Sequence, residues 1–129
     1  MAMPQMRSPL GRAIGLGSAK EGVEHWWMQR LTAIALVPLT LWLVIAVIQL
    51  AGADRDVLIV WLRHPLPAVL LVFLLFATFY HAALGLQVVI EDYVHHEGAK
   101  FTLSIAMRLL CILLGGLGIF AVLKLSLGA

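Results

Sequence analysis

Three long apolar segments constrain this chain more than any other feature of its sequence. They run over about residues 31–51, 66–90 and 103–125. A helix needs about twenty apolar residues to cross a hydrocarbon core about 30 Å thick. Each segment is apolar on all sides, which excludes an amphipathic helix lying on a surface. The connections are short and favour antiparallel neighbours, so we expect an all-α membrane protein with three transmembrane helices in an up-down-up bundle.

Composition agrees with a membrane protein and excludes several classes of function. Apolar residues make up 62% of the chain and charged residues 12%, against about half and about a quarter in a soluble domain. A length of 129 residues leaves no room for a soluble catalytic domain, so residues 1–129 are expected to form one membrane domain. The basic residues are scattered and make no patch suited to nucleic acid. Cys111 stands alone, which excludes a disulfide framework within the chain. Any chemistry therefore needs a cofactor or another subunit.

The distribution of lysine and arginine predicts the orientation. Basic residues are more numerous at the end that holds the amino terminus and the 91–102 connection than at the opposite end. The first group is Arg7, Arg12, Lys20, Arg30, Lys100 and Arg108, and the second is Arg55, Arg63 and Lys124. The positive-inside rule therefore places the amino terminus and the 91–102 connection on the cytoplasmic side. We expect residues 1–24 to form a cytoplasmic segment, irregular over residues 1–20 and lying against a partner.

The third apolar segment contains small residues within it and basic residues near its ends. Gly115, Gly116 and Gly118 predict close packing against a neighbouring helix, because small residues let backbones approach each other in lipid. Arg108 and Lys124 lie where long side chains can reach the membrane interface.

His81 is an ionisable residue in the middle segment, and such a residue is by default a candidate functional site. Ala77 and Gly85 lie one turn to either side on the same stripe and leave room for a flat group. A neutral imidazole is a common ligand of haem iron, so His81 is a candidate axial ligand. A histidine hydrogen-bonded to a neighbouring helix is the alternative. The other histidines, His25, His64, His95 and His96, all lie outside the apolar segments. A second axial histidine would therefore have to come from another subunit.

Two further groups of polar residues lie where helices meet the membrane surface. His25 and Arg30 precede the first segment and could reach anionic groups such as haem propionates, or simply lipid headgroups. Asp92 and Tyr93 close the middle segment. A phenol can hydrogen-bond a quinone carbonyl, and a carboxylate can relay protons. A hydrophilic helix end with an interfacial tyrosine explains the same two residues without a ligand.

Taken together, these residues resemble the small hydrophobic membrane anchor of succinate dehydrogenase, respiratory complex II, particularly of the bacterial type. The pattern is His25 followed by Arg30-x-Thr32-Ala33, then HAALGLQ from His81, then Asp92-Tyr93-Val94. The resemblance covers essentially the whole chain.

The resemblance implies an anchor subunit of an electron-transfer enzyme of the tricarboxylic acid cycle in the bacterial cytoplasmic membrane. It implies that His81 is one axial ligand of a haem b shared with a companion membrane anchor protein, with His25 and Arg30 near the propionates. It also implies that Tyr93 hydrogen-bonds ubiquinone, with Asp92 supporting that site, and that an iron–sulfur subunit and a flavoprotein subunit are partners. The alternatives are a haem-free anchor of a fumarate reductase using menaquinone and a cofactor-free assembly or transport subunit.

Overall fold

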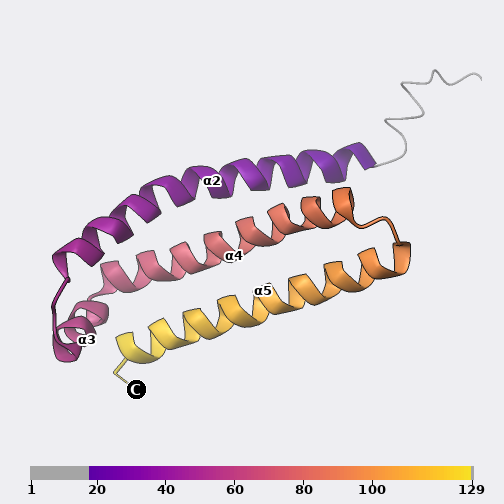
Figure 1. The fold of residues 1–129 in the computed structure, drawn as a ribbon. Coiled ribbons are helices and arrows are strands. Elements are labelled where there is room, and N and C mark those ends of the chain that lie inside the picture. The colour runs from indigo at the N-terminus through magenta and orange to yellow at the C-terminus, as the bar shows by residue number, and fades with distance from the viewer. Residues whose placement is uncertain (1–17, 129) are drawn as a thin grey trace, which may run out of the picture.

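The computed structural model of the chain describes residues 18–128, with side chains described from Gly22 onward, and holds four helices and no strand in that range. The helices are α2 (Ser18–Gln49), α3 (Arg55–Arg63), α4 (Pro65–Tyr93) and α5 (Glu97–Ser126). The three long helices run up, down and up, side by side (Figure 1). Each is long and apolar enough to cross a membrane. The predicted fold class is therefore confirmed.

Helix α4 lies in the middle of the bundle. It packs against α2 on one side and against α5 on the other, while α2 and α5 are not packed against each other (Figure 1). One end of the bundle holds the α4–α5 connection and the start of α2, and the opposite end holds α3 (Figure 1). A groove between two of the three long helices is therefore bordered by α4.

The helices extend beyond the apolar segments that predicted them. Helix α2 begins at Ser18, so residues 18–24 of the expected amino-terminal segment are helical, and the irregular conformation expected for residues 18–20 is wrong. Residues 1–17 lie outside the described part of the chain. Helix α5 begins at Glu97, about two turns before the apolar run. Backbone hydrogen bonding continues past the hydrocarbon layer because helical bonds are satisfied within the segment itself.

The first connection holds a short helix that the apolar segments did not predict. Gly52, at φ +79°, turns the chain after α2, and α3 follows from Arg55 to Arg63. Trp61 of α3 stacks on Trp42 of α2, with ring centroids 5.9 Å apart and an interplanar angle of 15°. The aromatic pair ties α3 to the end of the bundle.

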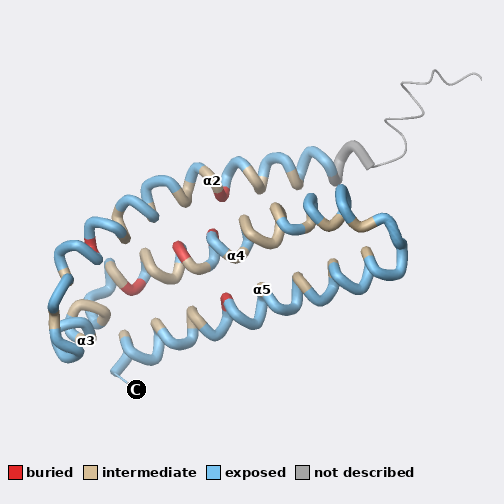
Figure 2. The backbone as a smooth tube through the Cα atoms, viewed as in Figure 1, coloured by how far each residue is buried: buried red, intermediate tan, exposed pale blue. Residues whose placement is uncertain are grey.

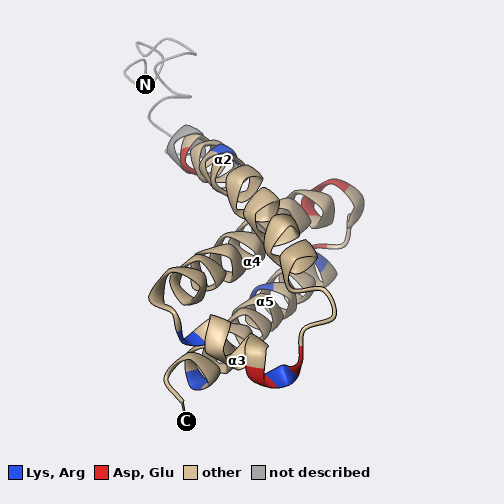
Figure 3. Ribbon diagram, turned by 90° about the vertical axis from the view of Figure 1, so that its left-hand side faces the viewer, with Lys and Arg blue, Asp and Glu red and all other residues tan. Residues whose placement is uncertain are grey.

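Few side chains are buried within the chain, as Figure 2 shows. The buried apolar residues are Ala46, Ala68, Leu74 and Ala77, and Thr32 is the buried polar residue. Most of the long apolar side chains are exposed, and the charged residues gather towards the two ends of the bundle (Figure 3). An outer surface of this kind suits contact with lipid or with other membrane subunits.

Of the three glycines of α5 predicted to pack closely, Gly115 and Gly118 do so. A Cβ at Gly115 would lie 3.3 Å from three side-chain atoms of Phe79, and one at Gly118 would lie 3.3 Å from Leu75. These positions therefore let α5 approach α4 closely. A Cβ at Gly116 would meet nothing within 4 Å, so close packing within the described residues does not explain that glycine.

Candidate functional site

His81 is held by a hydrogen bond from α4 to α2. Its Nδ1 lies 3.0 Å from Oγ1 of Thr32, whose side chain is buried. The single hydroxyl proton of Thr32 is directed to the backbone carbonyl of Met28, at 2.7 Å. The Gln29 carbonyl lies 3.1 Å from the same hydroxyl, so both candidate acceptors of its proton are backbone carbonyls. On that basis we assign Oγ1 as the acceptor from His81, with the ring proton on Nδ1 and a lone pair on Nε2. An imidazole in this state is ready to ligate a metal through Nε2.

The imidazole lines a groove between α2 and α4 with a volume of ≈ 600 Å³, here called the His81 groove. Its lining residues are Gly22, His25, Trp26, Gln29, Arg30, Ala33, His81, Gly85 and Val88. The structure thus brings together His25, Arg30 and His81, which the sequence singled out from two different segments. Of the predicted small-residue stripe, Gly85 lines the groove, whereas Ala77 is buried against the rest of the bundle.

His25 and Arg30 occupy different environments within the groove. His25 Nε2 donates to the backbone carbonyl of Leu84 at 3.2 Å and so fastens the start of α2 to α4. The Arg30 guanidinium lies over the Trp26 ring, 4.4 Å from its centroid. Among residues 22–128, no carboxylate lies within 4.0 Å of Arg30. Arg30 therefore presents an unneutralised cation at the groove, whereas His25 has a structural bond of its own.

Sequence reasoning missed Gln29, a further polar residue of the groove. Its Oε1 atom is buried and has no hydrogen-bond partner among the described residues. A buried acceptor without a partner costs about 1–3 kcal/mol, so a bound group or water with a donor would relieve it. Neither Gln29 nor the role of Thr32 carried a signal in the sequence, because both depend on how α2 lies against α4.

Asp92 and Tyr93 lie at the end of α4 and do not line the His81 groove. Tyr93 is 78% exposed, and neither side chain makes a hydrogen bond within the described residues. Asp92 lies on nearly the same face of α4 as His81, about 17 Å further along the helix axis, whereas Tyr93 is rotated from that face by about a third of a turn. The described part of this chain does not enclose a pocket around them.

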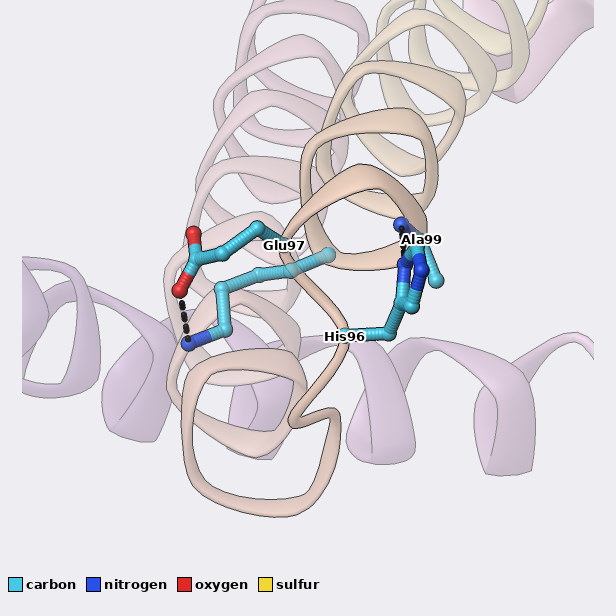
Figure 4. A network of polar contacts seen from close by, with 4 residues as sticks. His96, Glu97 and Ala99 are labelled. Carbon is cyan, nitrogen blue, oxygen red and sulfur yellow. Dashed lines mark hydrogen bonds and ion pairs between the residues drawn. The ribbon is translucent and has the colours of Figure 1, made fainter.

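The short turn after Tyr93 is organised by its own side chains, as Figure 4 shows. His96 caps α5, its Nδ1 accepting from the backbone N–H of Ala99 at 3.1 Å. Glu97 pairs with Lys100 at 4.0 Å, on a largely exposed surface. Because the Nδ1 lone pair of His96 is used to cap α5, we assign this residue a structural role in the turn.

A second groove, of ≈ 540 Å³, lies between α4 and α5 and is here called the Arg108 groove. Arg108 Nη2 donates to Gln87 Oε1 at 2.7 Å, and Gln87 Nε2 donates to Glu91 Oε1 at 3.0 Å. Arg108, which was predicted to extend towards the membrane interface, is hydrogen-bonded to the neighbouring helix α4. No pattern in the sequence indicated Gln87 as its partner.

The chain is similar to a known family of membrane subunits. The family described as "Succinate dehydrogenase/Fumarate reductase transmembrane subunit" matches residues 4–115. The succinate dehydrogenase hydrophobic membrane anchor subunit of Rickettsia bellii is 40% identical over 107 residues, covering 83% of this chain and 86% of that protein. The same subunit of Rickettsia conorii is 36% identical over 107 residues, covering 82% and 85%. No solved structure matches the chain.

Proposed function

The chain belongs to the succinate dehydrogenase/fumarate reductase transmembrane subunit family, and on that premise we propose that it anchors a succinate dehydrogenase in the bacterial cytoplasmic membrane. Its proposed partners are a flavoprotein subunit, an iron–sulfur subunit and a companion membrane anchor protein. The amino terminus and the α4–α5 connection would face the cytoplasm, where the hydrophilic subunits dock. The surface supports this role, because long apolar side chains cover most of the three spans.

The Thr32–His81 hydrogen bond is the observation that supports haem binding best. It leaves Nε2 of His81 with a lone pair inside a membrane-embedded groove. Metal-ligating histidines almost always donate their other ring N–H to a nearby acceptor, which is the arrangement here. The donor set therefore fits a haem b with His81 as one axial ligand. When bound, haem supplies a one-electron redox centre within the apolar layer.

The other residues of the His81 groove suit the polar edge of such a group. Arg30 carries a cation without a carboxylate partner among residues 22–128, which fits a propionate. His25 lies beside it, and its bond to Leu84 orients the imidazole at the rim. Gln29 Oε1 offers a buried acceptor to any donor in the groove. A second axial histidine would come from the companion membrane anchor.

Ubiquinone is the proposed electron acceptor, and the end of α4 is where this chain would meet it. The phenol of Tyr93 would donate a hydrogen bond to a quinone carbonyl, and Asp92 would support the site or its proton path. Reduction to the quinol takes two electrons from the iron–sulfur subunit and two protons from the aqueous side. The exposure of Tyr93 requires the remaining walls to come from the partner subunits.

Haem ligation is tested in the complex purified with its partner subunits. We expect His81→Ala to abolish the low-spin b-type spectrum, and the control His95→Ala, on the exposed turn, to retain it. An unchanged spectrum in His81→Ala would exclude ligation by this residue. A complex without haem whose extracted quinone is menaquinone would instead identify the anchor of a fumarate reductase type. Purification without hydrophilic subunits would favour an assembly or transport role.

The quinone site is tested with Tyr93→Phe, which removes the phenol hydroxyl and keeps the ring. Quinone reduction should fall, while succinate oxidation with a soluble dye acceptor should be unchanged, because the dye accepts electrons before they reach the membrane subunits. Tyr80→Phe is the matched control, since Tyr80 lies on the wall of the Arg108 groove. An equal fall of both activities in Tyr93→Phe would assign Tyr93 a structural role.

A further inference from the structure

The Arg108 groove lies apart from the candidate haem and quinone residues. It opens between α4 and α5, whereas the His81 groove opens between α2 and α4, and the two share no lining residue. Its walls are largely aromatic and aliphatic, and Phe76 stacks on Tyr80 with ring centroids 5.8 Å apart. The groove therefore offers a separate apolar surface within the membrane layer.

One end of the groove carries a cation whose charge the described residues do not neutralise. Arg108 donates to Gln87, which is neutral, and Gln87 in turn donates to Glu91. No carboxylate of residues 22–128 lies within 4.0 Å of the Arg108 guanidinium. A guanidinium has five N–H donors, so donors remain for an anion. Arg108 is exposed and lies where its side chain can reach the membrane interface, and a guanidinium there can bind a phosphate bidentately.

The length of the groove suits an acyl chain. Along α4 it runs from Gln87 to Leu75, and along α5 from Arg108 to Ile119. Twelve and eleven positions correspond to about 18 Å and about 17 Å of helix. One leaflet of a hydrocarbon core about 30 Å thick has a similar depth. A chain that enters at Arg108 would therefore reach the middle of the membrane.

Gly116 keeps this space open. A Cβ there would meet nothing within 4 Å, although the residue lines the groove. Its neighbours Gly115 and Gly118 are used by Phe79 and Leu75, so their lack of a side chain serves packing within the chain. The space beside Gly116, in contrast, is not occupied by any side chain of the described residues.

We propose that the Arg108 groove binds one anionic phospholipid, with the phosphate at Arg108 and an acyl chain along the groove past Gly116. The uncompensated cation selects a negative headgroup, and the apolar walls accept the chain. A quinone would fit against the apolar walls but has no negative charge to pair with Arg108. The binding would be independent of haem and of quinone reduction.

The experiment counts lipids bound to the whole complex by native mass spectrometry after transfer from nanodiscs of phosphatidylglycerol. We expect Arg108→Gln and Gly116→Leu each to lose one bound phosphatidylglycerol per complex. The first removes the charge, and the second places a side chain at a residue that lines the groove, where its Cβ would meet nothing within 4 Å. The matched controls, Lys124→Gln and Ala121→Leu, alter α5 outside the groove and should retain the lipid.

Several outcomes would overturn the proposal. An unchanged lipid count in both Arg108→Gln and Gly116→Leu would do so. Equal retention of phosphatidylcholine and phosphatidylglycerol by the unaltered complex would contradict recognition of charge. Loss of quinone with an unchanged lipid count would identify a quinone site instead. Should Arg108→Gln fail to assemble, the count in Gly116→Leu decides the matter alone.

Discussion

Replacing Thr32 by valine removes the hydroxyl that holds the His81 imidazole and changes little else. The two side chains have the same shape, and both are β-branched with similar helix propensities. The carbonyl of Met28, to which the hydroxyl donates, keeps its helical bond within α2. The substitution therefore acts mainly on Nδ1 of His81, which loses an acceptor 3.0 Å away.

The size of the effect follows from the cost of the unpaired donor. A half-buried N–H left without a partner costs about 1–3 kcal/mol, which is about 5–150-fold in an equilibrium constant. Changes to residues that orient a metal ligand cost about 10–100-fold in affinity, within the same range. We therefore expect Thr32→Val to weaken haem retention by about tenfold or more. The reduction potential should also rise, because an accepting hydroxyl raises the basicity of the imidazole and favours ferric iron.

The assay is haem content and reduction midpoint of the purified complex, followed during competition with a haem-binding apoprotein. Thr32→Ser keeps the hydroxyl and should retain haem nearly as the unaltered protein does. Thr40→Val makes the same substitution at an exposed position of α2 and serves as the control. Wild-type haem affinity and potential in Thr32→Val would refute the reasoning. Equal loss in Thr32→Ser would assign the effect to packing.

Two further predictions concern Arg30 in the His81 groove and the contact between α4 and α5. Arg30→Gln should release haem about tenfold more readily, since a charge-assisted hydrogen bond is worth about 1.5–3 kcal/mol. Haem content after dialysis measures this release, and full retention of haem would contradict a contact between Arg30 and a propionate. Gly115→Ala should lower the melting temperature of the membrane subunits, because its Cβ would lie 3.3 Å from Phe79 and overpacking costs about 1–3 kcal/mol. Gly116→Ala, in open space, should not lower the melting temperature, because alanine favours a helix over glycine by about 1 kcal/mol. An equal fall in both variants would refute the packing argument.

Short amphipathic elements and helix ends were the parts of the fold that the apolar segments left unpredicted. Helix α3 follows Asp54 and places Leu58, Trp61 and Leu62 on one side, a pattern too short to rise above a connecting loop. Its contacts include residues distant in sequence, because Trp61 stacks on Trp42 of α2 and the helix packs against α4 and α5. The long helices, in contrast, follow directly from runs of apolar residues.

The residues of the candidate site also differ in how far the sequence alone indicates them. His25, Arg30 and His81 stand out individually, because charged or ionisable residues are unusual in or beside apolar segments. Thr32 does not, because a threonine in an apolar helix can satisfy its hydroxyl on its own backbone. Arg108 also stands out as a charge near the end of the third apolar segment, but its pairing with Gln87 is not evident until α4 and α5 lie side by side.

Three membrane crossings, and the residues that are chemically out of place in them, follow from the amino-acid sequence alone. The length of each apolar segment determines the crossings, and the cost of polar groups in lipid makes the polar residues stand out. Neither depends on how the helices pack against one another. The contacts among those residues come from the tertiary structure. His81 is hydrogen-bonded to Thr32, His25 and Arg30 line the same groove as His81, and Arg108 lines one end of a second groove. These relations depend on the rotation and axial offset of α2 and α5 against α4, which side-chain packing determines and helical periodicity leaves open.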